Sequence, residues 1–267
     1  MLKDIRRDES GVSEAIGFIL VFTIVILGIS IVTLYGYPVL ADARISSDEK
    51  IMEQNMIILQ NDIKILTRSN VPYRDTTIGV SGGSIFVTNS TEAENQNGEY
   101  FNITYFNTTG VKKWKKYYPG SLEFVSDAGT AVVSVANGAV VKRQQDQQGS
   151  VMVSDPRWFY DKKEGTLVIF MTSLNSTQAM SLGGIGTIQM AMLTPPKIHD
   201  FDYTTTPREV FIDYNAASND DYSRAWHTYL TSSSTVGFTE VPPNSNKYKR
   251  SVKRLVIKEY DINILGI

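Results

Sequence analysis

The chain has 267 residues, 42% of them hydrophobic and 20% charged, a composition typical of a folded globular protein and not of a disordered one. Its formal net charge is −2, from 26 basic and 28 acidic residues, so it lacks the basic excess of nucleic-acid-binding proteins. It contains no cysteine, which excludes disulfides, thiolate metal sites and cysteine nucleophiles but leaves export possible.

Residues 15–40 form a long apolar segment without a charged side chain. As a helix it would measure roughly 39 Å, enough to cross the roughly 30 Å hydrocarbon core of a bilayer. Residues 41–43 (Ala-Asp-Ala) match a secretory cleavage pattern, but the apolar part of a cleaved signal has only about 7–15 residues, so we expect the segment to be retained. Lys3, Arg6 and Arg7 precede it, which favours a cytoplasmic N-terminus and an external C-terminal part.

The residues just before the apolar segment carry a more specific pattern. The charged leader MLKDIRRDES ends at Gly11, and VSEAIG follows from Val12. This arrangement resembles an archaeal class III signal peptide, the leader of type IV pilin-like proteins. The resemblance implies that a prepilin-type peptidase cleaves between Gly11 and Val12 and leaves the apolar helix on the mature chain. It also implies contacts with membrane lipid and with copies of the same chain or other pilins.

Glu14 is the acidic residue at the start of this helix, and two interpretations remain open. A carboxylate in a first helical turn is stabilised by the helix dipole by about 0.3–1 kcal/mol. Alternatively, Glu14 is an assembly residue that pairs with the freed N-terminal amine of a neighbouring subunit, because an unpaired charge in an apolar environment is costly. Bacterial pilins place such a glutamate at the fifth mature residue, whereas Glu14 would be the third.

Residues 41–70 predict an amphipathic extension of the same helix. The apolar residues are separated by seven, four, three, four and three positions, which is a helical stripe. We expect this stripe to pack on the chain's own external domain in preference to an intermolecular coiled coil. The helix should kink at Gly36 and Pro38 and end near Asn70, since Pro72 follows. The stripe comprises Ile45, Met52, Met56, Leu59, Ile63 and Leu66.

Residues 71–267 show the two-residue period of strands, which predicts an α+β protein with a mainly antiparallel, sandwich-like β-rich domain after the long helix. Asn137-Gly138 lies between alternating apolar arms and predicts a hairpin. A short helix is expected over 220–230, and Gly183–Gly186 is interpreted as a tight turn. Strands are expected at 76–80, 83–89, 99–107, 120–126, 130–136, 138–144, 150–155, 166–174, 186–193, 208–214 and 254–265.

Several candidate sites lie in this domain. Four Asn-x-Ser/Thr sequons are candidate N-glycosylation sites, some of which chance alone can supply; they begin at Asn89, Asn102, Asn107 and Asn175. The aromatic residues Trp114, Tyr117 and Tyr118 lie among four lysines and form a candidate adhesion surface for carbohydrate or an acidic cell wall, although aromatic residues are also ordinary strand residues.

Other side chains favour no catalytic or metal site. His199 and His227 have no second histidine at ligand spacing. Asp200 and Asp202 can hold calcium only with carbonyl help, and Asp-rich loops are also plain turn formers. We therefore expect no cofactor, no metal and no enzymatic activity.

Two functions are consistent with the sequence. The first is a structural, pilin-like cell-surface subunit, anchored in the membrane or assembled into an extracellular filament through its N-terminal helix. The chain is long for a major subunit of that group, which favours a minor or adhesive one. The alternative is a membrane-tethered, non-polymerising binding module for a glycan or cell-wall ligand. The expected organisation is a leader over 1–11, an apolar helix over 12–40, its extension over 41–70 and an external domain over 71–267.

Overall fold

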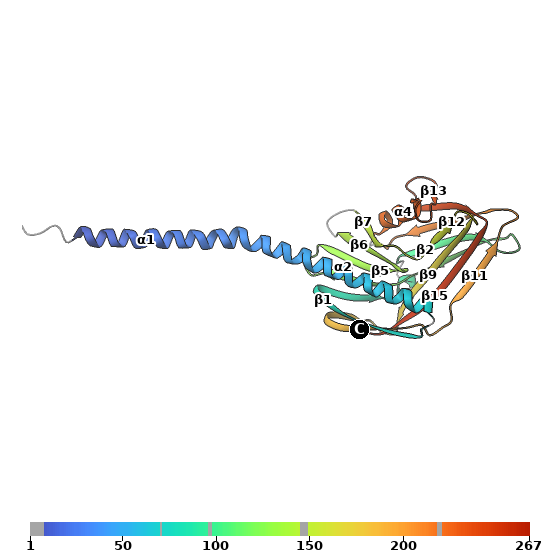
Figure 1. Cartoon of the computed structure of the whole chain (residues 1–267), viewed down its shortest axis with the longest axis horizontal. Helices are drawn as coiled ribbons and strands as arrows, with labels where there is room; N and C mark the ends of the chain where they lie inside the picture. The colour runs from blue at the N-terminus through green and yellow to red at the C-terminus, as the bar shows by residue number, and fades with distance from the viewer. Residues whose placement is uncertain (1–7, 70, 96–97, 145–148, 218–220) are drawn as a thin grey trace, which may run out of the picture. The chain divides into compact units, whose positions relative to one another are not determined.

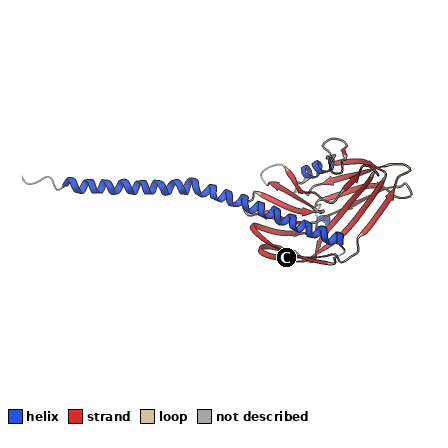
Figure 2. Ribbon diagram, in the orientation of Figure 1, coloured by secondary structure: helices blue, strands red, loops and turns tan. Residues whose placement is uncertain are grey.

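The computed structural model describes residues 8–69, 71–95, 98–144, 149–217 and 221–267 (Figure 1). The chain divides into two compact units, Met1–Asp48 and Glu49–Ile267. The first contains an apolar helix, and the second contains the end of that helix with a β-rich domain (Figure 2). An α+β fold with a long N-terminal helix is therefore confirmed.

The first unit is helical. Helix α1 (Asp8–Ile31) leads through a π-helical turn, η1 (Val32–Gly36), into helix α2 (Tyr37–Ser69). Within the part of the chain that the structure describes, one helix is long and apolar enough to cross a membrane. Gly11, Val12 and Glu14 all lie in α1, while residues 1–7 of the expected leader lie outside the described residues.

The irregular turn η1 ends two residues before Pro38. Proline has no N–H to donate to the carbonyl four residues earlier, and its ring crowds that carbonyl. At η1 the backbone hydrogen bond spans five residues instead of the four of an α-helix, because the Tyr37 N–H donates to the Val32 carbonyl. A π-helical turn is a recognised way to absorb such an irregularity. Gly36 ends η1 and Pro38 is the second residue of α2, so the helix changes its hydrogen-bond pattern where the sequence predicts a kink.

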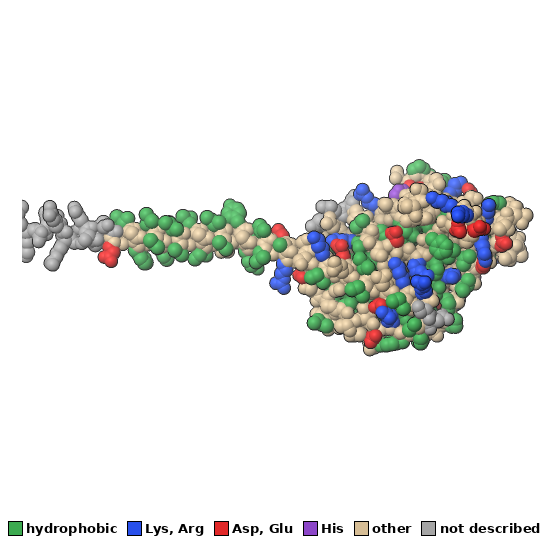
Figure 3. All heavy atoms as spheres, in the orientation of Figure 1, with side chains coloured by type: hydrophobic (Ala, Val, Ile, Leu, Met, Phe, Trp, Pro, Cys, Tyr) green, Lys and Arg blue, Asp and Glu red, His purple; other side chains and the backbone are tan. Residues whose placement is uncertain are grey.

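Among the described residues of the first unit, the large apolar side chains of α1 are largely exposed. Phe18 is 72% exposed and Leu27 55%, and Figure 3 shows hydrophobic side chains along the whole visible length of this helix. Threonine hydroxyls bond within the helical backbone: Thr23 of α1 donates to the Ile19 carbonyl at 2.7 Å, and Thr33 of η1 donates to the Ile29 carbonyl at 2.9 Å. The helix thus exposes apolar groups while leaving few polar groups that need water.

In the second unit, the rest of α2 buries one face. The stripe residues from Met52 to Leu66 are at most 2% exposed and join a core cluster with the sheet residues Ile85 and Leu122. The prediction that the stripe packs on the chain's own domain is confirmed for these residues. Ile45, the first residue of the stripe, belongs to the first unit and is partly exposed.

Buried polar side chains fix the position of this part of α2. Gln60 is fully buried, and its amide donates to the Gly138 carbonyl at 2.7 Å and to the Asp155 carbonyl at 3.1 Å. Asp62 accepts hydrogen bonds from Arg74 and Thr76. Because unpaired buried polar groups are costly, these contacts allow only one register of the helix against the strands.

Two sheets make up the domain. Among the described residues, the larger sheet has ten strands in the order β7-β6-β5-β4-β1-β10-β15-β9-β8 with β11 paired to β15, and the smaller has five in the order β13-β14-β12-β2-β3. The strands are β1 (Tyr73–Thr88), β2 (Tyr100–Phe106), β3 (Lys112–Tyr117), β4 (Ser121–Ser126), β5 (Ala131–Ala136), β6 (Ala139–Gln144), β7 (Ser150–Ser154), β8 (Phe159–Asp161), β9 (Thr166–Ser176), β10 (Ser181–Ala191), β11 (Lys197–Asp202), β12 (Arg208–Asn215), β13 (Thr239–Glu240), β14 (Lys247–Val252) and β15 (Arg254–Gly266); the short helices are α3 (Ser90–Asn95) and α4 (Ser223–Thr231).

The larger sheet has a core on each face. Along β6, Val140 belongs to the cluster that contains α2, whereas Ala139 and Val141 belong to a second cluster with the smaller sheet and α4. Trp226 of α4 is fully buried in that second cluster, with its ring centroid 4.7 Å from that of Phe101 in β2. The domain therefore has three layers, in which the larger sheet lies between α2 and the smaller sheet.

Several local predictions can be compared with this fold. The Asn137-Gly138 hairpin is confirmed: β5 pairs with β6, and the two turn residues have φ values of 49° and 71°. The tight turn expected at Gly183–Gly186 is wrong, because these residues lie inside β10, where Gly184 has a φ of 80° opposite a register shift in β1. The sheets are mainly antiparallel as predicted, but β15 pairs in parallel with β9.

Replacement of one stripe residue tests the packing of α2. Ile63→Ala should lower the free energy of unfolding by about 2–5 kcal/mol, because it leaves a cavity in a closed core. Ile58→Ala is the matched control on the same helix, since Ile58 is 50% exposed, and it should cost less than about 1 kcal/mol. Urea unfolding of the full chain in detergent micelles, followed by tryptophan fluorescence, measures both. Equal losses would contradict the assigned inner face.

Candidate ligand-binding face

Strand β3 lies at the edge of the smaller sheet and presents two different faces. Side chains alternate along a strand, so Lys112, Trp114 and Lys116 point to one side while Lys115 and Tyr117 point to the other. The exposures agree: Trp114 is 68% exposed and Tyr117 only 7%. The first side faces away from the core, and the second faces the larger sheet.

The outer side carries a shallow depression of about 450 Å³, which we call the Trp114 face, lined by Asn102, Thr104, Lys112, Trp114 and Lys116. Residues of β2 form its floor, because Thr104 lies opposite Trp114 in the register and Asn102 lies opposite Lys116. An exposed indole therefore lies between two ammonium groups above an amide and a hydroxyl. Of the three aromatic residues predicted to form an adhesion surface, only Trp114 belongs to this lining, together with the sequon residue Asn102.

The lysines of the Trp114 face are positioned by aromatic rings. Lys112 Nζ lies 5.1 Å from the centroid of the Phe211 ring, and Lys116 Nζ lies 4.6 Å from that of Tyr100. Such cation–π contacts hold an ammonium by about 0.5–1 kcal/mol at exposed sites. Tyr118 is half-buried and supports Tyr100, with ring centroids 5.4 Å apart.

Asn102 has an unused acceptor in this face. Its amide nitrogen lies 3.3 Å from an Asp213 carboxylate oxygen. Its carbonyl oxygen is buried and has no hydrogen-bond partner among the described residues. A buried acceptor without a partner costs free energy, and this one lies beneath the surface of the face. The face thus offers a flat apolar ring and two cations.

On its inner side, β3 is tied to the larger sheet through Glu259 of β15. Lys115 Nζ lies 2.6 Å from Oε2 of Glu259, and the Tyr117 hydroxyl donates to Oε1 at 3.0 Å. His199 Nε2 of β11 lies 2.9 Å from the same oxygen. Burial raises the pKa of Glu259, but the Lys115 ammonium, the Tyr117 hydroxyl and His199 outweigh it, and the net pKa is below the usual value. These contacts fix the edge strand that displays Trp114.

The prediction that Tyr117 belongs to an adhesion surface is therefore wrong. It is buried in the core that joins the two sheets, and burial followed by the Glu259 charge raises the pKa of its hydroxyl. It cannot contact an external ligand. The physical reason is the two-residue period of β3, which places neighbouring aromatic residues on opposite faces.

The four sequons have different surroundings. Asn89, just after β1, donates its amide hydrogen to the Ser176 carbonyl at 2.6 Å. Asn175 in β9 is linked to the Ser90 hydroxyl. Asn102 lies in the Trp114 face, where a glycan would cover the depression. Asn107, in the turn from β2 to β3, accepts from the Thr109 and Val111 amides through its side-chain oxygen.

The remaining candidates are engaged in structural contacts. Asp200 forms an ion pair with Arg254, with Oδ1 2.8 Å from Nε, and this guanidinium lowers the pKa of Asp200. Asp202 Oδ1 accepts the Thr204 N–H at 2.8 Å. His227 Nδ1 lies 3.6 Å from a Glu240 carboxylate oxygen. Within the described residues, no group of three or more histidine, aspartate and glutamate side chains is placed to hold a metal ion.

The sequence did not indicate that Asn102 and Thr104 lie beside Trp114, nor that β3 has two different faces. The sequence KKWKKY indicates these two faces if it is taken as a strand. Alternation then places the tryptophan on one face with two lysines and the tyrosine on the opposite face with the other two lysines. No strand is among those expected over residues 112–117, so the two sides of this segment are not separated in the predicted adhesion surface.

A protein-family model described as "Family of unknown function (DUF7289)" matches residues 10–262. The match covers the apolar helix together with the β-rich unit. Comparison of the chain with curated proteins and with solved structures gave no match.

Proposed function

The chain belongs to the family of unknown function DUF7289, and from that premise we propose that it is a structural, pilin-like cell-surface protein. In this proposal α1 holds the chain in the cell membrane or in an extracellular filament, and the β-rich domain lies outside the cell. The role is assembly and contact, without catalysis. Its partners are membrane lipid, copies of itself or other pilins, and a prepilin-type peptidase during maturation.

The exposure of α1 is the observation that carries this proposal. Apolar side chains such as Phe18, Val21 and Ile29 are 60–72% exposed, and burying one such side chain is worth about 1.5–3 kcal/mol. Across a whole helix this free energy strongly favours removal from water. A bilayer and a bundle of identical helices both provide that environment.

The start of α1 supports the pilin-like version of the anchor. Glu14 is exposed, and every residue from Ala15 to Leu40 is uncharged. A single carboxylate at the mouth of an apolar helix can face interfacial water or pair with an amine of a neighbouring chain. The resemblance of residues 1–17 to a class III leader supports the second arrangement, in which cleavage after Gly11 supplies that amine.

The N-terminus of the protein isolated from its own cells tests this function. Mass determination should find Val12 as the first residue, and sheared surface filaments should contain the protein. Gly11→Phe should block processing, because the peptidase of this family cuts after a small residue, while Ser10→Ala should not. A native N-terminus at Met1, or one created by cleavage after Ala43, would contradict the pilin route.

The Trp114 face favours a second candidate function, binding of an acidic glycan by the tethered domain. An exposed indole offers a flat surface for the apolar side of a sugar ring, and Lys112 and Lys116 offer charges for its carboxylates. This function does not require assembly, so a protein that anchors without forming filaments can still perform it.

Binding to polygalacturonate, compared with uncharged dextran, tests this second function. The full chain should bind polygalacturonate more tightly, and added salt should weaken binding because exposed charges are screened. Trp114→Ala should weaken binding by roughly tenfold, the loss of a single buried aromatic contact. Phe159→Ala is the matched control, since Phe159 is 50% exposed in β8. Equal affinity of the two variants would rule out the Trp114 face.

A further inference from the structure

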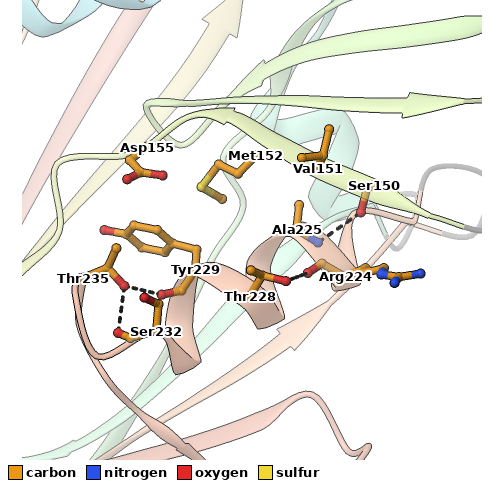
Figure 4. Close-up of a pocket in the computed structure, with 10 residues that line it drawn as sticks. All are labelled: Ser150, Val151, Met152, Asp155, Arg224, Ala225, Thr228, Tyr229, Ser232 and Thr235. Carbon is orange, nitrogen blue, oxygen red and sulfur yellow. Dashed lines mark hydrogen bonds between the residues drawn. The ribbon is translucent and has the colours of Figure 1, made fainter.

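A second depression lies between the edge strand β7 and helix α4 (Figure 4). It has a volume of about 460 Å³ and shares no lining residue with the Trp114 face. Sites for small molecules are typically about 300–1,000 Å³, apolar in the middle and polar at a few points. This pocket has that composition.

The middle of the pocket is apolar and fixed in place. Met152 of β7 faces Ala225 and Tyr229 of α4, which are 1% and 4% exposed. The Tyr229 hydroxyl donates to the Trp158 carbonyl at 2.9 Å, and the Ala225 N–H donates to Ser150 Oγ at 3.1 Å. The two walls are therefore linked to each other, and the methionine provides an adaptable apolar surface between them.

Asp155 provides a negative charge at one end. Its backbone carbonyl accepts hydrogen bonds from Gln60 Nε2 and Lys64 Nζ, each at 3.1 Å. These contacts hold the backbone at the point where the chain leaves β7. The carboxylate itself is exposed, and its negative charge acts to raise the pKa of the neighbouring Lys64 and Tyr229 side chains.

Arg224 provides a positive charge at the other end. Figure 4 shows it on the opposite side of the pocket from Asp155, which lies beside Tyr229. Arg224 is exposed, and within the described ranges its guanidinium has no carboxylate partner. An anion and a cation therefore lie at opposite ends of one pocket.

The length of the α4 wall between the two ends of the pocket limits the ligand. Arg224 and Tyr229, beside which Asp155 lies (Figure 4), are five positions apart on α4, which corresponds to about 7.5 Å along the helix axis. The ammonium and carboxylate of one α-amino acid are joined by only two bonds of about 1.5 Å, too short for this wall. An extended chain of two or three residues covers about 7–10 Å. Such a chain matches the length of the wall from the Asp155 end to the Arg224 end.

The position of β7 suits a peptide backbone. This strand is at the end of the larger sheet, and an edge strand offers unpaired N–H and C=O groups to an extended chain. On the facing wall, the Thr228 hydroxyl already donates to the Arg224 carbonyl at 2.9 Å. Its oxygen therefore remains as an acceptor for a ligand amide.

We propose that this pocket binds a short zwitterionic peptide of two or three residues. The peptide's ammonium pairs with the Asp155 carboxylate, and its carboxylate pairs with the Arg224 guanidinium. Its backbone runs along β7, and its apolar groups contact Met152, Ala225 and Tyr229. The site does not depend on how α1 is used, so it stands or falls separately from the pilin-like function.

Calorimetric titration of the full chain in detergent micelles with trialanine tests the proposal. Trialanine should bind, and N-acetyl-trialanine and trialanine amide should each bind at least about tenfold more weakly, because each lacks one charge. Asp155→Asn should weaken the binding of trialanine by a similar factor but leave the affinity for N-acetyl-trialanine unchanged. Arg224→Gln should likewise weaken the binding of trialanine but leave the affinity for trialanine amide unchanged.

Matched controls distinguish this result from general loss of charge. Asp75→Asn and Arg44→Gln change exposed residues outside the pocket and should leave every affinity unchanged. The proposal is overturned if trialanine gives no binding heat at millimolar concentration. It is also overturned if the blocked peptides bind as tightly as trialanine, or if Asp155→Asn weakens the free and acetylated peptides equally.

Discussion

Removal of apolar helical side chains from water is the constraint on which the rest of this structure depends. The helix over Glu14–Arg68 is continuous, but its two parts meet the constraint differently. From Met52 onward, the apolar stripe is buried under the chain's own larger sheet. Before Leu40 the apolar side chains are exposed, so their burial needs lipid or other chains. The membrane or filament proposal follows from this difference between the two parts.

The buried part of α2 also organises the surfaces that can bind ligands. Gln60 and Lys64 hold the Asp155 carbonyl, which fixes one end of the pocket beside α4. Glu49 and Glu53 together pair with Lys142 of β6, at 3.0 Å and 2.6 Å. On the other side of the larger sheet, Glu259 fixes β3 and with it the Trp114 face. Both candidate surfaces are thus attached to rigid elements.

Much of the fold could be predicted from periodicity. The helical stripe from Met52 to Leu66, the end of α2 near Asn70 and the Asn137-Gly138 hairpin all rest on local patterns. Long-range pairing could not be predicted: the parallel contact of β9 with β15 joins residues 88 positions apart, such as Thr166 and Arg254, and no local signal specifies it. The turn predicted at Gly183–Gly186 was wrong because a glycine cluster is compatible with both a turn and an irregular strand. Only the long-range pairing with β1 decides between the two. The Trp114 face was half predicted, because composition identified the cluster but not which side chains share a face.

The absence of cysteine from the sequence allows a direct test of the central claim, that α1 leaves water while the β-rich domain lies outside the cell. Single variants Phe22→Cys, in α1, and Thr108→Cys, in the turn between β2 and β3, can be treated in intact cells with a membrane-impermeant maleimide. The account predicts that Thr108→Cys is labelled at once and that Phe22→Cys is labelled only after denaturation. Equal labelling of the two variants in intact cells, or labelling of Thr108→Cys only after lysis, would contradict it.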